Sequence, residues 1–458
     1  MNKAVDLPEV EIDDAENHPS NNSGNRPFND ILAATVKRRD VMKGSLAAGA
    51  TGFFASSFVQ HAEAFKEGPY GLNIQFTPVT LADAAAGDGR MPLISPDYEY
   101  DVLIPWGDPL EPSGPAFREQ ANTSEEQARQ IGIGHDGMWF FPLKEDMEPR
   151  LRRAKINQRG LLVINHEFGR NSHVLGKDAP ESLEEVRRSE HAHGVSVVRI
   201  ENIDGKWQTV DSNLSRRIHV NTPVAFSGPA ADSDLLKTPN GNLALGTVNN
   251  CGNGTTPWGT YLTCEENFNG YFGANNFEMT WVPTVEQERY GFSDNGFGYG
   301  WHVFDRRFDL SDPDYRNEEN RFGWIVEIDP YEPTRKPTKR TAMGRFKHEG
   351  AAWREAEDGR IAFYMGDDQR FDYIYKYLSA RPWRDMIAEG VSPLDEGTLF
   401  VAQFQEGGFG EWLPLTPDNP NITSYTTQDE ILVYARVAAD DAGATPMDRS
   451  EWTATGLD

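Results

Sequence analysis

A thiol and two carboxylates stand side by side in the segment GTYLTCEENFNGYF (residues 259–272), as Cys264, Glu265 and Glu266. The other cysteine of the chain, Cys251, follows two asparagines in the segment NNCGNG. Carboxylate and amide oxygens suit Ca²⁺, whereas a thiolate selects iron, zinc or copper. A pocket that gathers both kinds of side chain could hold Ca²⁺ beside a transition metal. Alternatively, Cys251 and Cys264 could form a disulfide across an expected hairpin.

Three more polar clusters follow or precede apolar runs. They combine acidic residues with asparagine, histidine or arginine, and their segments are LLVINHEFGR (161–170), GRFKHEGAAW (344–353) and PMDRSEW (446–452). Taken singly, a His-Glu pair is more often a solvated turn, and Arg449 with Glu451 could be a surface ion pair that contributes little stability. The recurrence of such clusters at the ends of separate apolar strands favours a shared site.

The reaction class follows from these residue types and from motifs that the sequence lacks. The chain has no lysine-containing phosphate loop, no G-x-S-x-G and no H-E-x-x-H. Metal-assisted hydrolysis is therefore the chemistry that the clusters favour. An arginine beside a metal cluster could bind an anionic substrate through two parallel hydrogen bonds, which points to a phosphoester.

Short strands separated by turn signals are expected to position these clusters. Asp204-Gly205 divides two strand-like runs in residues 195–210, and residues 359–378 repeat this hairpin pattern. Further strands are predicted in three segments: GWIVEIDP (323–330), GTLFVAQF (397–404) and EILVYARV (430–437). Short helices are predicted at 122–131 and 181–190, on the N-terminal side. The number and spacing of strands predict an all-β fold, a β-propeller that is incomplete in this chain.

The N-terminal residues carry an expected export signal. Arg38 and Arg39 precede Lys43 and a short apolar run over residues 44–59, and Ala62-Glu63-Ala64 is an A-x-A cleavage pattern. This pattern is typical of the twin-arginine route, which carries folded proteins. We therefore expect residues 1–64 to be a signal peptide with an N-terminal extension, and 65–458 to be the propeller domain. The apolar run is too short to span a membrane, and the net charge of −27 disfavours binding to nucleic acid.

From Arg38 onward, the sequence resembles the PhoX-type alkaline phosphatases. The segments that carry the resemblance include INHE, NNCGNGTTPWGTYLTCEENFNGYF, NRFGWIVEIDP, KRTAMGRFKHEGAAW, MGDDQRFDYIYKY and MDRSEW. The resemblance implies a β-propeller, exported by the twin-arginine machinery, that hydrolyses phosphate monoesters at alkaline pH. It also implies Ca²⁺ and a pair of Fe³⁺ ions as cofactors. Members of the family continue well beyond the MDRSEW motif, so we expect a C-terminally truncated member.

The resemblance also implies roles for particular side chains. Cys251 is expected to bind iron, Glu349 a metal and Glu451 Ca²⁺, while Arg449 is expected to clamp the phosphate. The weaker candidates are Glu167, Glu265 and Glu266 for the metals and Asn250 for a phosphate contact. We prefer Cys251 to Cys264 as the iron ligand because NNCG has the composition of an irregular loop, whereas Cys264 follows an alternating strand and could be a packed thiol.

The sequence thus predicts a monomeric, secreted alkaline phosphatase for phosphate acquisition, located in the periplasm or outside the cell. Two alternatives remain. One is a non-catalytic Ca²⁺-binding propeller, which has no use for a thiol beside its carboxylates. The other is a lactonase-like hydrolase that uses Ca²⁺ without iron, in which Cys251→Ser would leave activity intact.

Overall fold

The computed structural model describes residues 18–42, 77–80, 83, 92–143, 157–277 and 279–456. The chain divides into two compact units. One comprises residues 1–31 and 104–458 and contains all the sheets described below; we call it the sheet unit. The other comprises residues 32–103. The predicted apolar run at 44–59 and the A-x-A pattern lie outside the described residues, so the export signal stays a prediction.

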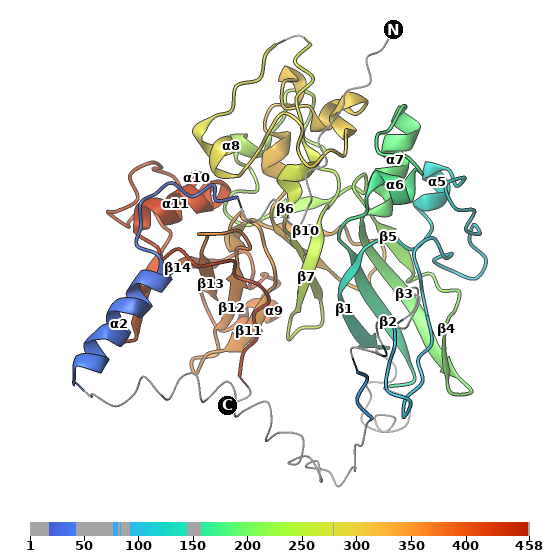
Figure 1. Ribbon diagram of the computed structural model, residues 1–458, viewed down its shortest axis with the longest axis horizontal. Helices are drawn as coiled ribbons and strands as arrows, with labels where there is room; N and C mark the ends of the chain where they lie inside the picture. The colour runs from blue at the N-terminus through green and yellow to red at the C-terminus, as the bar shows by residue number, and fades with distance from the viewer. Residues whose placement is uncertain are drawn as a thin grey trace. The chain divides into compact units, whose positions relative to one another are not determined.

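The sheet unit contains three five-stranded sheets, which are mainly antiparallel (Figure 1). The first has the order β1-β2-β3-β4 with β5 also paired to β3, and its strands are β1 (His135–Pro142), β2 (Arg159–His166), β3 (Gly194–Ile203), β4 (Lys206–Thr209) and β5 (Arg216–Ile218). The second has the order β6-β10-β9-β8-β7, and its strands are β6 (Ala225–Ser227), β7 (Asn250–Thr255), β8 (Tyr261–Glu265), β9 (Ile325–Ile328) and β10 (Thr338–Arg340). The third is a meander of β11 (Ala352–Glu355), β12 (Ile361–Gly366), β13 (Ile374–Ser379), β14 (Gly397–Gln405) and β15 (Phe409–Pro414).

Most of the predicted hairpins are confirmed. Asp204 and Gly205 both have positive φ, as the tight turn between β3 and β4 requires. Residues 359–378 form β12 and β13, and the segments 323–330 and 397–404 contain β9 and most of β14. The mainly β class is therefore confirmed. A closed propeller is not visible in the described residues, and the propeller stays a prediction.

The helices are short. They are α2 (Phe28–Met42), α5 (Ser124–Gln127), α6 (Asn171–Val174), α7 (Leu183–Ala192), α8 (Val285–Arg289), α9 (Trp383–Ala388), α10 (Gln428–Val433) and α11 (Ala435–Ala442). Single 3₁₀ turns are η2 (Asp234–Leu236), η3 (Phe268–Tyr271), η4 (Trp301–Val303), η5 (Arg306–Phe308), η6 (Pro313–Tyr315), η7 (Glu318–Arg321) and η8 (Thr341–Met343). The helices predicted at 122–131 and 181–190 correspond to α5 and α7. Within the described part of the chain, no helix is both long and apolar enough to cross a membrane.

One predicted strand is wrong. The segment EILVYARV forms the end of α10 and the start of α11 instead. Thr427 and Glu430 form a capping box, in which each side chain binds the main-chain N–H of the other residue. This cap and the alanine-rich continuation after Tyr434 favour a helix over the strand that the apolar run alone suggests.

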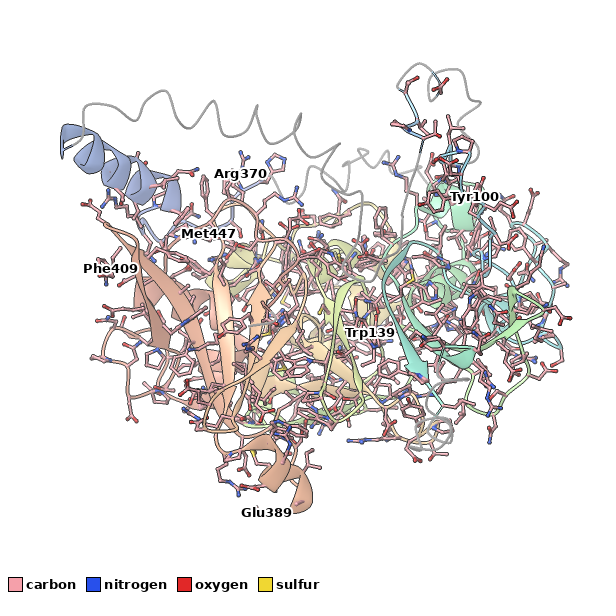
Figure 2. All side chains as sticks on the ribbon, turned by 90° about the horizontal axis from the view of Figure 1, so that it is seen from below. Tyr100, Trp139, Arg370, Glu389, Phe409 and Met447 are labelled. Carbon is pink, nitrogen blue, oxygen red and sulfur yellow. The ribbon has the colours of Figure 1, made fainter. Side chains whose placement is uncertain are left out.

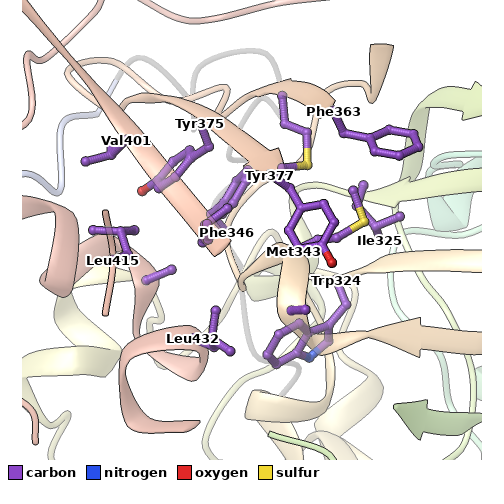
Figure 3. Close-up of a cluster of buried hydrophobic side chains, with 14 of the residues drawn as sticks. Trp324, Ile325, Met343, Phe346, Phe363, Tyr375, Tyr377, Val401, Leu415 and Leu432 are labelled. Carbon is purple, nitrogen blue, oxygen red and sulfur yellow. The ribbon is translucent and has the colours of Figure 1, made fainter. Parts of the chain in front are cut away.

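Among the described residues, the largest cluster of buried hydrophobic side chains joins strands of the third sheet to β8 and β9 of the second. Figure 3 shows Tyr375 and Tyr377 of β13 among aliphatic and aromatic side chains from neighbouring elements. Phe346 stacks on Tyr375 with a distance of 4.0 Å between ring centroids. Because Phe346 lies three residues before Glu349, this packing fixes the segment that leads to the edge of the sheet where the acidic residues collect.

Candidate metal centre

Seven potential metal ligands meet where the three sheets approach one another. Within the described residues they form three groups, in each of which the ligand atoms lie within 4.8 Å of one another: Asp136, Glu167 and Cys251; Cys251, Glu266 and Glu349; Glu349, Asp368 and Glu451. Because Cys251 and Glu349 each belong to two groups, the three groups form one continuous centre.

The ligands occupy corresponding places in the three sheets. One ligand stands at or just before the start of the edge strand nearest the centre: Asp136 in β1, Cys251 in β7 and Glu349 ahead of β11. A second ligand follows the neighbouring strand: Glu167 after β2, Glu266 after β8 and Asp368 after β12. Glu451 comes from the C-terminal segment. Each sheet thus contributes a pair of ligands, and none of the three groups is complete without residues from two different parts of the chain.

Glycines after the edge-strand ligands allow the sheets to come this close. A Cβ atom on Gly137 would lie 2.8 Å from the carbonyl oxygen of Cys251. A Cβ on Gly252 would lie 1.5 Å from the carbonyl oxygen of Glu349, which is far inside van der Waals contact. Only glycine allows main chains to approach this closely, so the two positions set the spacing between ligands on adjacent sheets.

Main-chain hydrogen bonds fix the same arrangement. Asn249 has a left-handed φ of 48°, and its carbonyl accepts from the N–H of Glu266 at 3.0 Å. This contact joins the loop before Cys251 to the residue after β8. Across the next boundary, the N–H of Glu349 donates to the carbonyl of Gly366 at 3.2 Å, and the N–H of Asp368 donates to the carbonyl of Lys347 at 3.1 Å.

The ligands crowd like charges in a buried place. The Sγ atom of Cys251 lies 3.2 Å and 3.4 Å from the two carboxylate oxygens of Glu349. Burial, then the carboxylates led by Glu266, raises the pKa of the Cys251 thiol far above its usual value. Burial is also the main cause that raises the pKa of Glu349 to about 9, and it raises the pKa of Asp136. Such a site favours cations. A bound cation would offset both the cost of burying the ionised groups and the repulsion between them.

The donor set fits a mixed metal centre. Two of the groups include the Cys251 sulfur, a soft ligand that suits iron, and the third consists of carboxylates alone, which suit Ca²⁺. The residues present therefore match the ligand preferences of both kinds of predicted metal.

Arg449 stands at the carboxylate end of the centre. Its guanidinium forms a two-pronged contact with Asp368, with Nε at 3.0 Å from Oδ1 and Nη2 at 2.8 Å from Oδ2. Nη2 also lies 3.2 Å from a carboxylate oxygen of Glu451. The residue has a left-handed φ of 56°, a conformation that is costly for a long side chain. This left-handed conformation therefore occurs at the residue whose side chain contacts two potential ligands, Asp368 and Glu451.

Two of the predicted site residues have other partners. Glu265 is buried and accepts from Lys339 Nζ at 2.7 Å and from the N–H groups of Gly323 and Trp324 at 2.9 and 3.0 Å. It belongs to none of the three groups. Asn250 donates from Nδ2 to the hydroxyls of Thr247 and Thr263 at 2.7 and 2.8 Å, which holds β7 against β8.

The two cysteines are free thiols, so the disulfide alternative is wrong. They lie in different surroundings: Cys251 faces the acidic centre, whereas Cys264 is fully buried in the hydrophobic core beside Ile325. The structure therefore gathers Cys251, Glu167, Glu266, Glu349, Glu451 and Arg449 and leaves Cys264 and Glu265 in the framework.

Sequence reasoning missed Asp136 and Asp368. The signal for Asp136 was present, because His135-Asp136-Gly137 repeats the pattern of His348-Glu349-Gly350. Asp368 lies in the Gly366-Asp367-Asp368 turn, where an acidic residue has an ordinary role in turn formation. Its neighbour Asp367 pairs with Arg436 instead, so the sequence could not distinguish the ligand from the ion-pair partner.

Comparisons with known proteins place this β-rich fold in a family. The profile described as alkaline phosphatase PhoX matches residues 76–456, and the chain belongs to this family. A solved structure of Pseudomonas fluorescens PhoX in complex with vanadate, a transition state analogue, is similar at a TM-score of 0.72 and 42% sequence identity. The similarity covers 79% of this chain and 63% of that one, so the chain spans less than two thirds of the length of that protein. A comparison with curated proteins found no match.

Proposed function

We propose that the chain is an alkaline phosphatase that hydrolyses phosphate monoesters at a centre of iron and Ca²⁺. The observation that carries the proposal is the continuous group of seven potential ligands, with the buried Cys251 at its middle and Arg449 at its edge, in a member of the PhoX family. The similar Pseudomonas protein binds vanadate, described as a transition state analogue, which supports a phosphoryl-transfer site here.

The ligand chemistry supports one distribution of the ions over the three groups. Cys251, with Asp136 and Glu167 on one side and Glu266 and Glu349 on the other, would hold the iron pair. The carboxylate group of Glu349, Asp368 and Glu451 would hold Ca²⁺. When bound, these ions supply Lewis-acid charge that activates water and offsets the charge on the phosphoryl group.

The residues of this chain then have separate tasks. Asp368 orients the Arg449 guanidinium through two parallel contacts, so that the group is held at the edge of the centre before substrate arrives. The guanidinium would bind two phosphoryl oxygens, in which charge develops during the reaction. Asn250 stays a weaker prediction for a phosphate contact, because both N–H groups of its side chain already donate to threonine hydroxyls. No side chain is assigned as a nucleophile, because bound water can serve in that role.

The wider proposals concern fold and location. The three sheets, each with one edge strand at the centre, support a propeller-like arrangement of blades around the metals. The Arg38-Arg39 pair and the following apolar run support export by the twin-arginine route to the periplasm or beyond. Phosphate acquisition is the role that an exported phosphomonoesterase would serve.

The test is hydrolysis of p-nitrophenyl phosphate by the full chain at pH 9, with Ca²⁺ and then with EGTA. We expect turnover that EGTA abolishes and excess Ca²⁺ restores. Cys251→Ser should abolish turnover and remove iron from the purified protein, whereas the matched variant Cys264→Ser should keep both. Turnover that persists in EGTA, or that survives Cys251→Ser, would contradict the proposal.

The alternatives give different results in the same assays. A Ca²⁺-binding protein without catalysis would bind the ion in a calorimetric titration and hydrolyse no phosphoester. A lactonase-like hydrolase would cleave a lactone in the presence of Ca²⁺ and keep this activity after Cys251→Ser. The thiol within 3.2 Å of Glu349 disfavours both, because neither chemistry requires a soft ligand.

A further inference from the structure

Residues 18–31 form part of the sheet unit, although they precede the expected export signal. We call this segment the N-terminal strap. The main-chain carbonyl of His18 accepts from Gln369 Nε2 at 2.8 Å. The amide of Asn21 donates to the carbonyl of Phe371 at 2.7 Å and to the hydroxyl of Tyr373 at 2.8 Å. The strap therefore binds three residues of the loop that follows β12, which is the loop that carries Asp368.

The rest of the strap is held by neighbouring elements. Asn25 donates to the carbonyl of Asp440 in α11 at 3.0 Å, and the N–H of Phe28 donates to the carbonyl of Pro446 at 3.0 Å. The Phe28 ring packs edge-on against Phe404, with 5.2 Å between centroids. Phe28 also lies near Met447, which Figure 2 labels. The strap thus spans from the Asp368 loop to the C-terminal segment that leads to Arg449 and Glu451.

Buried ion pairs anchor the other side of the same loop. Arg436 is fully buried and pairs with Asp367, with Nε at 2.8 Å from Oδ2. Arg289 pairs with Asp372 at 2.6 Å. Gln369 connects the buried arginines to the N-terminal strap, because its side chain donates to the carbonyl of His18 and accepts from Arg436 Nη1 at 2.9 Å. The loop therefore lies between an inner layer of arginines and the outer strap.

One residue of the loop requires such support. Phe371 has a φ of 71°, in the left-handed region, which is a strained conformation for a large aromatic residue. Its N–H donates to the carbonyl of Met447 at 2.8 Å, and its carbonyl accepts from Asn21. Strained conformations persist where surrounding contacts hold them, and here one of those contacts comes from the strap.

We propose that the N-terminal strap is an intramolecular clamp that holds the loop 366–373 in the conformation that presents Asp368. Strap docking and cation binding then strengthen each other, because both favour the same loop conformation. This coupling rests on the proposed function, in which Asp368 binds a cation. Since the strap lies before Arg38 and Arg39, removal of the leader would release it, and the clamp would act while the centre assembles.

Hydrogen exchange in the full chain tests the clamp. Asn21→Ala removes the two side-chain contacts to the loop, and the adjacent Asn22→Ala is the matched control because Asn22 is exposed. In EGTA, we expect Asn21→Ala to speed exchange in peptides covering residues 366–374 about tenfold, the effect of two lost hydrogen bonds. Asn22→Ala should exchange as the wild type does. Equal exchange in the two variants would overturn the proposal.

A Ca²⁺ titration of the same proteins tests the coupling. We expect Asn21→Ala to weaken Ca²⁺ binding several-fold relative to Asn22→Ala, and Ca²⁺ to slow exchange in the strap of the wild type. Faster loop exchange with an unchanged Ca²⁺ affinity would overturn the coupling. A wild-type chain that binds no Ca²⁺ would instead contradict the proposed function, and the exchange result in EGTA would still decide whether the strap clamps the loop.

Discussion

The side-chain amide of Asn165 donates to the main-chain carbonyl of Cys251 at 2.5 Å and to that of Gly252 at 2.9 Å. Asn165 lies near the end of β2, two residues before Glu167, and is fully buried. Its Oδ1 atom lies 3.0 Å from the hydroxyl of Tyr261. This one amide therefore joins the ligand-bearing end of the first sheet to the cysteine of the second.

Asn165→Asp should disrupt the centre. The substitution replaces a donor of two hydrogen bonds with a buried carboxylate that faces two carbonyl oxygens, a change that costs about 2–4 kcal/mol of stability. We expect a lower urea midpoint and less metal per folded chain. Tyr261→Phe is the milder comparison. It removes the hydroxyl contact to Asn165 Oδ1 but keeps the two bonds from the Asn165 amide to the carbonyls of Cys251 and Gly252. An Asn165→Asp variant with wild-type metal content would show that this bridge does not position Cys251.

Gly252→Ala should separate two adjacent ligands. The added Cβ would meet the carbonyl oxygen of Glu349 at 1.5 Å, so the main chains of β7 and the segment before β11 must move apart. We expect near-complete loss of bound iron and Ca²⁺, measured by elemental analysis of folded protein. Gly350→Ala is the control, because its Cβ would find no atom closer than 3.7 Å. Equal metal loss in both variants would contradict this account of the spacing.

Glu265→Gln and Glu266→Gln should have different effects although the residues are adjacent. Glu265→Gln leaves the buried Lys339 ammonium without its counter-charge, which costs about 3–5 kcal/mol of stability. Glu266→Gln instead removes a ligand, and it should lower metal content with a smaller change in the urea midpoint in EGTA. Metal loss from the folded Glu265 variant as large as that from the Glu266 variant would place Glu265 in the centre after all.

His193 should make the fold sensitive to acid. The ring is buried against Tyr271, Tyr299 and Trp301, and burial lowers its pKa to about 4. The unfolded chain, with a histidine pKa of about 6.5, binds more protons between these values, so stability falls as the pH drops from about 6.5 to about 4. Urea midpoints measured across this range should fall less steeply for His193→Gln than for the wild type.

The control for that prediction is His173→Gln, at an exposed position. Its pH profile should match that of the wild type. Only part of the acid sensitivity should disappear with His193, because burial also lowers the pKa of His191 to about 4 and that of His219 to about 2. Parallel profiles for the wild type and both variants would contradict the role of the buried ring.

Local patterns predicted the strands because alternation and turn chemistry act over a few residues. Residues 195–210 carry both signals, and they form β3 and β4 as expected. The segment 430–437 is apolar enough for a strand, but the cap at Thr427 lies outside the apolar run and decides for a helix. Propensity is a weak guide where a neighbouring cap or tertiary contact competes with it.

The sequence predicted the ligands of the candidate site only where they belonged to a distinctive polar cluster. Cys251, Glu349 and Glu451 stood in polar clusters with asparagine, histidine or arginine, and the family resemblance gave them roles. Asp136 was missed although a histidine stands beside it, and Asp368 was missed because an Asp-Asp pair after a glycine is ordinary in a turn. What separates Glu266 from Glu265 is the lysine at position 339, which no local pattern can reveal, since it lies on a different strand.

The order of the ligands along the chain has a consequence for biosynthesis. Asp136 and Glu451 serve one centre, yet nearly the whole of the sheet unit lies between them in the sequence. Translation produces the pair from the first sheet early and Glu451 last. The seven potential ligands can therefore come together only after residue 451 has been synthesised, and a nascent chain that stops before this residue holds an incomplete set. Metal content, if the centre is loaded as proposed, would then report that synthesis has passed residue 451 and that all three sheets have folded.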